Sequence, residues 1–80
     1  MSTADQVLAA LAAVLESDEA VRDPDLPLYD LNLLDSLKTV ELMVALAGRF
    51  GVELSPAEFE RQQWATPRKI IAYMESRVGP

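Results

Sequence analysis

The sequence predicts an all-α fold: a small four-helix bundle with a long loop between the first two helices and a short third helix. Apolar residues recur at three- and four-residue steps in several segments, and no segment shows the alternating pattern of a strand. The chain has 80 residues, 50% of them hydrophobic, so residues 1–80 are expected to form one domain with no room for a second.

The composition excludes several classes of protein. With 13 acidic and 7 basic residues the net charge is -6, which argues against nucleic acid as a partner. The chain contains no cysteine and no histidine, so disulfides, thiolate nucleophiles, serine-histidine triads and sulfur-ligated zinc are ruled out. We expect no catalytic residue and no metal site.

The N-terminal segment argues against a membrane or secreted location. The longest apolar stretch, residues 7–15, is too short to span a bilayer. The first residues lack the basic start and the apolar run of a signal peptide. We therefore expect a cytoplasmic protein.

The first helix is predicted to begin near Ala4 and to end near Ser17. Thr3 stands three residues before Gln6, which is the spacing of a capping box. The stripe of this helix that is expected to face the core consists of Val7, Leu8, Leu11, Val14 and Leu15.

Residues 18–35 are predicted to form a long loop, because Pro24 and Pro27 prevent a continuous helix. Asn32 is expected to adopt a left-handed turn conformation. The acidic residues of the loop lack the spacing of a calcium site, so we interpret them as a solvated surface. The apolar side chains expected to hold this loop against the core are Leu26, Leu28, Tyr29, Leu31, Leu33 and Leu34.

The second helix is predicted to span Ser36 to Phe50, with Gly51 closing it in the left-handed conformation. Its apolar residues form two seams. From periodicity alone we expect both seams to lie in the core, and the alternative is that the second seam meets a partner. The first seam is Leu42, Leu46 and Phe50, with Met43 beside it, and the second is Leu37, Val40 and Val44.

Two further helices are predicted after Gly51. Ser55 and Pro56 carry the signals of a helix start, so a short third helix is expected from Pro56 to about Arg61. Thr66 and Pro67 repeat these signals, and the last helix is expected to run from Pro67 to about Arg77, with Gly79 and Pro80 ending it. Residues expected in the core are Ile70, Ile71, Met74 and Val78, with Phe59 and Trp64 as aromatic anchors.

Asp35 and Ser36 stand at the start of the longest helix, where free N–H groups and the helix dipole favour an anion. The pair alone is also compatible with an ordinary helix start. However, residues 33–42, Leu-Leu-Asp-Ser-Leu-Lys-Thr-Val-Glu-Leu, resemble the attachment site of acyl and peptidyl carrier proteins. The resemblance implies an acyl-carrier bundle in which Ser36 carries 4′-phosphopantetheine, transferred from coenzyme A, and Asp35 begins the helix beside it.

Residues 32–36 and 58–67 also resemble the D-alanyl carrier branch of this family, through Asn-Leu-Leu-Asp-Ser and Glu-Phe-Glu-Arg-Gln-Gln-Trp-Ala-Thr-Pro. Asn32 departs from that branch, which usually has Gly there. The resemblance implies a stand-alone, monomeric carrier that holds D-alanine as a thioester. Its implied partners are a phosphopantetheinyl transferase, an ATP-dependent adenylating ligase and an acyltransferase of a membrane-bound system.

The resemblance also assigns partner docking to the helix that carries Ser36. Lys38 replaces part of the acidic surface typical of fatty-acid carriers, so docking should depend more on apolar contacts than on charge. The docking residues implied are Leu37, Val40, Glu41 and Val44.

Two alternatives stay open. One is an aminoacyl or acyl carrier of a natural-product pathway, which keeps the arm and changes the cargo. The other is a helical interaction module without a prosthetic group, in which the apolar seams bind a partner helix and Ser36 is dispensable.

Overall fold

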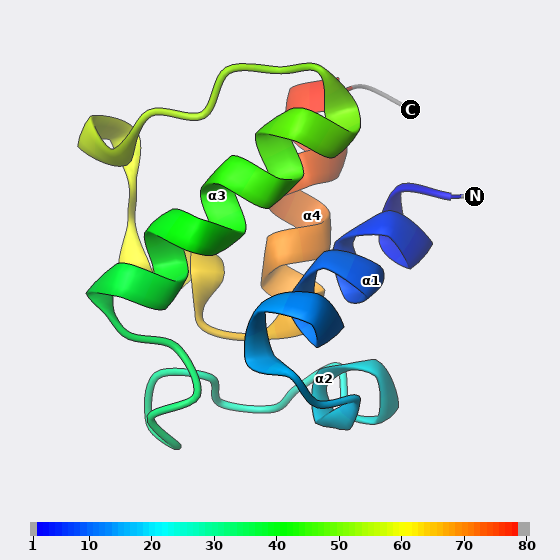
Figure 1. Cartoon of the computed structure of the whole chain (residues 1–80), viewed down its shortest axis with the longest axis vertical. Helices are drawn as coiled ribbons and strands as arrows, with labels where there is room; N and C mark the ends of the chain where they lie inside the picture. The colour runs from blue at the N-terminus through cyan, green and yellow to red at the C-terminus, as the bar shows by residue number, and fades with distance from the viewer. Residues whose placement is uncertain (1, 79–80) are drawn as a thin grey trace.

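The structure, a computed structural model, describes residues 2–78. Within this range all of the regular secondary structure is helical and there is no strand, which confirms the all-α prediction. Helix α1 packs against both α3 and α4, and the long loop with α2 lies at one end of these three helices (Figure 1). The elements are α1 (Thr3–Leu15), α2 (Glu19–Arg22), α3 (Ser36–Phe50), the 3-10 turns η1 (Pro56–Glu58) and η2 (Arg61–Trp64), and α4 (Pro67–Val78).

Helix α1 has different ends from those predicted. Its N-cap is Ser2, whose hydroxyl accepts a hydrogen bond from the N–H of Asp5 at 3.1 Å, so the predicted cap at Thr3 is wrong. The Asp5 carboxylate lies in the first turn, where the helix dipole favours a negative charge. The helix ends at Leu15, two residues before the predicted end, because Glu16 adopts a left-handed conformation (φ 53°).

The long loop contains a short helix, α2, that the sequence did not indicate. The Ser17 hydroxyl accepts from the N–H of Glu19 at 3.2 Å, and Arg22 pairs with Asp18 one turn earlier. Ala20 anchors this turn because its side chain is fully buried. Four residues are too few to show a periodic pattern, which is why this helix was expected to be loop.

The rest of the loop is held against the body of the protein as expected, with one exception. Leu26, Leu28 and Leu34 are buried, whereas Leu31 is exposed and does not contribute to the core. The N–H of Leu28 donates to the carbonyl of Ala65 at 2.9 Å. The loop therefore has both side-chain and backbone contacts with the segment before α4.

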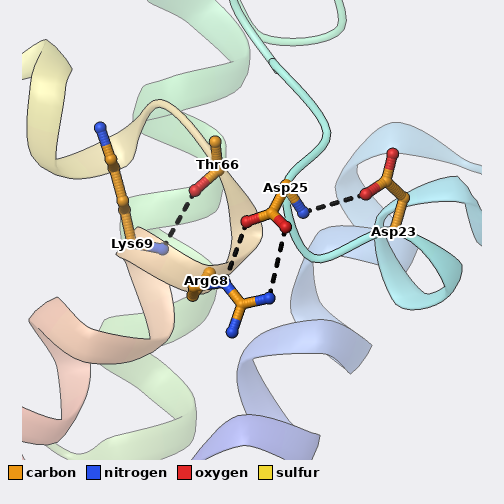
Figure 2. A network of polar contacts seen from close by, with 5 residues as sticks. All are labelled: Asp23, Asp25, Thr66, Arg68 and Lys69. Carbon is orange, nitrogen blue, oxygen red and sulfur yellow. Dashed lines mark hydrogen bonds and ion pairs between the residues drawn. The ribbon is translucent and has the colours of Figure 1, made fainter.

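A polar network joins the same loop to the start of α4 (Figure 2). The side-chain Nε of Arg68 donates to the Asp25 carboxylate at 2.9 Å. The backbone N–H of Arg68 donates to the carbonyl of Pro24, also at 2.9 Å. Thr66 caps α4 through its hydroxyl, which accepts from the N–H of Lys69 at 3.2 Å. This confirms the helix start predicted at Thr66 and Pro67.

The Asp25–Arg68 ion pair leads to a pH-dependent prediction. The hydrogen bond from Arg68, together with its charge, lowers the pKa of Asp25 below its usual range, against an opposing effect of desolvation. A carboxyl group whose pKa is lower in the folded than in the unfolded state stabilises the fold at pH values above the unfolded-state pKa. This contribution is lost as the pH falls through the folded-state pKa. We expect Asp25→Asn to have a lower melting temperature than the wild type at pH 7, and the difference to become smaller as the pH falls below the unfolded-state pKa of about 3.9.

The control for this prediction is Asp30→Asn, which makes the same charge change in the same loop, at an exposed carboxylate. Melting temperatures measured by circular dichroism from pH 7 to pH 3 give the comparison. The effect should be small, because both partners of the Asp25 pair are largely exposed. An Asp25→Asn difference that persists unchanged at pH 3 would contradict the assignment.

Helix α3 begins and ends where predicted. Asp35 caps it, and Gly51 adopts the left-handed conformation (φ 66°) that closes it. Asn32, at φ 59°, confirms the other predicted left-handed position. Between its two ends α3 packs against α1.

The predicted third helix, Pro56 to Arg61, is wrong. Two 3-10 turns replace it, and Phe59 and Glu60 between them are extended. In a continuous α-helix two residues five positions apart point about 140° away from each other. The break instead lets Phe59 and Trp64 lie together, with ring centroids 6.1 Å apart.

The core lies among α1, α3 and α4 and extends under the long loop. Trp64 is buried as predicted, and its ring also packs against Tyr73 of α4, with centroids 5.4 Å apart. Phe59 is only partly buried. The buried apolar residues are Val7, Ala10, Leu11, Ala20, Leu26, Leu28, Leu34, Leu42, Met43, Leu46, Trp64, Ile70 and Met74.

The remaining residues expected in the core line its margin. They are partly buried and pack against the buried set: Leu8, Val14, Leu15, Phe50, Ile71 and Val78. Helix α4 ends at Val78, one residue beyond the predicted end, and the ending predicted at Gly79 and Pro80 lies outside the described residues. None of the helices in residues 2–78 combines the length and apolarity that crossing a membrane requires.

Candidate functional site

Ser36 is exposed and is the first residue of α3. The Asp35 carboxylate accepts from the N–H of Lys38 at 2.8 Å, and the Asp35 carbonyl accepts from the N–H of Thr39 at 2.8 Å. No described group accepts from the N–H of Ser36 or Leu37. The start of α3 therefore presents free donors and the positive end of the helix dipole beside the Ser36 hydroxyl.

The chain before Ser36 is held by the loop. The N–H groups of Leu33 and Leu34 both donate to the carbonyl of Leu28, at 2.9 and 3.1 Å. Leu34 is buried, and Asn32 makes the left-handed turn that directs it inward. These contacts define where the loop ends and place Asp35 and Ser36 at the surface.

A cavity of about 460 Å³ lies beside Ser36. Three separate parts of the chain form it: the end of the long loop, the first two turns of α3, and the segment around η1 and η2. This volume is within the range of small-molecule sites in proteins. The lining residues are Tyr29, Asn32, Leu34, Asp35, Ser36, Thr39, Val40, Met43, Pro56, Phe59 and Arg61.

Tyr29 connects the three parts of this cavity. Its hydroxyl and that of Thr39, which is buried, lie 2.8 Å apart in a hydrogen bond. Its ring meets Phe59 edge-on at 6.2 Å, and the Arg61 guanidinium lies 4.7 Å from the ring centroid. Burial raises the pKa of Tyr29, while the Thr39 hydrogen bond and the Arg61 charge oppose that increase.

The sequence did not identify Tyr29, Thr39 or Arg61 as site residues. The structure places the Arg61 guanidinium over the ring of Tyr29. No sequence signal could reveal this contact, because Tyr29 in the long loop and Arg61 in η2 are far apart in the sequence and meet only in the fold.

The docking residues named from the resemblance lie on the outer face of α3. Leu37 and Val44 are each 68% exposed and Val40 is 43% exposed, and Glu41 is exposed as well. The expectation from periodicity that both seams of this helix lie in the core is therefore wrong. Only the seam of α3 that faces α1 is buried. We call Leu37, Val40, Glu41 and Val44 the α3 outer stripe.

Lys38 is turned away from this stripe. Its Nζ donates to the carbonyl of Val14 at 3.3 Å, near the last turn of α1, where a positive charge complements the helix dipole. The stripe therefore presents apolar side chains with a single acid, Glu41, between them.

A scan against family models matches residues 5–74 to the phosphopantetheine attachment site family. The chain belongs to this family. Its members are non-catalytic carriers, and their prosthetic group is 4′-phosphopantetheine. Membership favours a carrier over an interaction module without a prosthetic group.

Curated relatives of this family member carry the name D-alanyl carrier protein. The relative from Lacticaseibacillus casei (strain BL23) is 48% identical over 69 residues, which cover 86% of this chain and 85% of the relative. Those from Listeria innocua and Enterococcus faecalis are each 37% identical over 76 residues, covering 95% of this chain and 97% of the relative. Nothing in these likenesses supports the natural-product alternative.

Proposed function

We propose that this carrier holds D-alanine as a thioester on a 4′-phosphopantetheine group attached to Ser36 and delivers it to an acyltransferase. The observation that carries the proposal is the position of Ser36: an exposed hydroxyl at the first residue of α3, inside the matched range 5–74. The names and near-complete coverage of the relatives support D-alanine as the cargo.

The residues around Ser36 fit the prosthetic group. Its phosphodiester is an anion, and the free N–H groups and the dipole at the start of α3 stabilise a negative charge there. The Asp35 carboxylate is turned to the N–H of Lys38, which lessens its repulsion of that charge. The group supplies a thiol that holds a carboxylic acid as a thioester, and the chain, which has no cysteine, has no thiol of its own.

The proposed partners are a phosphopantetheinyl transferase, an ATP-dependent adenylating ligase and an acyltransferase. A carrier that visits several enzymes in turn requires weak contacts with fast release. The α3 outer stripe suits this need, because it is a small apolar surface next to Ser36 rather than a broad interface.

The attachment is tested by intact-protein mass after incubation with coenzyme A and a broad-specificity phosphopantetheinyl transferase. We expect a gain of one phosphopantetheine, and fragmentation of the tryptic peptide should place the added mass on Ser36. A folded protein that gains no mass beside an active transferase control would refute the carrier function.

The cargo is tested with the phosphopantetheinylated protein and a panel of adenylating enzymes given D-alanine, L-alanine, glycine or a short fatty acid. We expect the D-alanine-activating ligase to form the thioester with the highest kcat/KM for the carrier. Preferential formation by an enzyme of another specificity would refute D-alanine and favour the natural-product alternative.

The docking role of the α3 outer stripe leads to a mutational prediction. Because Val44 is 68% exposed, Val44→Asp should leave the melting temperature within about 3 °C of the wild type, as expected for surface substitutions. It should lower the transferase kcat/KM about tenfold, the effect of losing one well-packed interface side chain.

The matched control is Ala72→Asp, which places the same charge on an exposed position of α4. This variant should retain the wild-type kcat/KM. Equal losses in both variants would indicate that net charge, rather than the stripe, determines docking.

A further inference from the structure

Thr39 is the one buried polar residue within residues 2–78, and it lies on α3 only three residues after Ser36. The other buried residues around it are apolar. A hydroxyl in such surroundings is costly unless it has a hydrogen-bond partner. Its partner is the hydroxyl of Tyr29, 2.8 Å away. The core therefore contains one directional polar contact between side chains, on the helix that carries Ser36.

This contact closes residues 29–39 into a ring that contains Ser36. The backbone of Tyr29 is fixed at one end, because its carbonyl accepts from the N–H of Asn32 at 3.0 Å. At the other end the N–H of Thr39 donates to the carbonyl of Asp35 at 2.8 Å. Among the described residues no hydrogen bond holds the Ser36 hydroxyl itself. The direction in which Ser36 is presented therefore depends on how the start of α3 is held to the long loop.

Tyr29 is a firm anchor for this ring. Its side chain meets Phe59 edge-on at 6.2 Å, and the Phe59 ring in turn packs against the buried Trp64 at 6.1 Å. Burial raises the pKa of Tyr29, so its hydroxyl stays protonated and available to Thr39. The hydrogen bond thus connects the helix of Ser36, through the long loop, to the aromatic side chains of the η1–η2 segment.

We propose that Tyr29 and Thr39 are positioning residues for the phosphopantetheine transfer, and that their hydrogen bond holds the start of α3 so that Ser36 is presented in one orientation. This inference rests on the proposed attachment at Ser36. In that step the Ser36 oxygen bonds to the phosphorus nearest the pantetheine of coenzyme A. The bond from this phosphorus to the bridging oxygen breaks, adenosine 3′,5′-bisphosphate leaves and Ser36 loses its proton. Such a displacement depends on alignment of the attacking oxygen.

Stability alone does not require these two hydroxyls. Replacing both partners of a buried hydrogen bond by apolar groups of the same shape is often nearly neutral for stability. A phenylalanine and a valine would fill the same space as Tyr29 and Thr39. What an apolar pair lacks is direction, because burial of apolar surface is non-directional whereas a hydrogen bond fixes distance and angle. The hydroxyl pair therefore contributes orientation at the segment that carries Ser36.

The test measures kcat and KM of a broad-specificity phosphopantetheinyl transferase for the unmodified chain as its substrate, with coenzyme A in excess. The variants are Tyr29→Phe, Thr39→Val and the double variant Tyr29→Phe/Thr39→Val. Assays are run at a temperature at which circular dichroism shows every variant fully folded. The reaction starts from a chain without an arm, so contacts of an attached group do not enter the rates.

We expect kcat to fall about fivefold in each single variant, the factor that corresponds to one neutral hydrogen bond. The double variant should show a similar fall rather than the product of two, because both changes remove the same contact. The KM for the carrier should change by less than about twofold, because the α3 outer stripe is untouched. Thr39→Ser, which keeps the hydroxyl, should retain most of the wild-type kcat.

Melting temperatures separate positioning from stability. Tyr29→Phe leaves the Thr39 hydroxyl buried without its partner and should melt about 4–8 °C below the wild type. The double variant should regain most of this loss and still have the lower kcat. The control is Val7→Ala, a fully buried position of α1 outside residues 29–39. It should lose at least as much stability as Tyr29→Phe and keep the wild-type kcat.

Three results would overturn the positioning role: a double variant with wild-type kcat, a fall in kcat for Val7→Ala equal to that for Tyr29→Phe, or a loss that appears in KM instead of kcat. A failure of the proposed function looks different. If the wild type gains no mass, the attachment at Ser36 fails. If the wild type is modified and the variants react at the same rate, only the role of Tyr29 and Thr39 fails.

Discussion

Ser36→Ala is expected to abolish the mass gain with coenzyme A and a phosphopantetheinyl transferase, and with it all thioester formation. The Ser36 hydroxyl is the proposed attachment atom, and the chain has no cysteine that could accept a cargo directly. The fold should remain intact, because Ser36 is exposed and Asp35 rather than Ser36 caps α3. The circular dichroism spectrum and the melting temperature should therefore match the wild type.

The matched control for this variant is Ser55→Ala, which removes the hydroxyl of another serine beside a helical turn. It should gain one phosphopantetheine at the wild-type rate. A mass gain in folded Ser36→Ala would show that another residue carries the arm. Loss of helical signal in Ser36→Ala would show that the hydroxyl has a structural role.

Trp64→Ala is expected to cause the largest loss of stability. Trp64 is the only tryptophan of the chain and is 1% exposed, between Phe59 and Tyr73. Truncating a buried tryptophan costs about 3–5 kcal/mol, including the cavity it leaves. The total free energy of unfolding for a domain of this size is roughly 4–12 kcal/mol. The variant should therefore lose much of its stability and unfold in part at 37 °C.

Urea denaturation followed by far-ultraviolet circular dichroism measures this loss without depending on the tryptophan signal. Trp64→Phe is the control, because it keeps an aromatic ring between Phe59 and Tyr73 and should lose much less. A Trp64→Ala variant with a midpoint close to the wild type would mean that η2 does not hold the core together.

The main helices could be predicted because their signals are local. The limits of α3 follow from Asp35 at its start and Gly51 at its end, and those of α4 from Thr66 and Pro67. Short elements were missed or misassigned for the converse reason. Helix α2 is too short to show a periodic pattern. The start signal at Ser55 is present, but η1 and η2 replace the predicted third helix, because continuing that helix would separate Phe59 from Trp64.

The candidate site divides in the same way. Residues 35–44 contain Asp35, Ser36 and the α3 outer stripe, so a sequence motif and helical spacing were enough to predict them. Tyr29, Phe59 and Arg61 belong to the cavity only because the long loop and the η1–η2 segment meet beside the start of α3. No local pattern encodes this proximity.

The sequence by itself determined the helical class, the position of Ser36 at a helix start and the family, because capping, periodicity and motifs depend on neighbouring residues. Only the tertiary structure decided which seam of α3 is buried and which side chains surround Ser36. An amphipathic pattern shows which residues are apolar, but burial depends on what packs against them. In α3 the seam facing α1 is covered, whereas Leu37, Val40 and Val44 have no such cover.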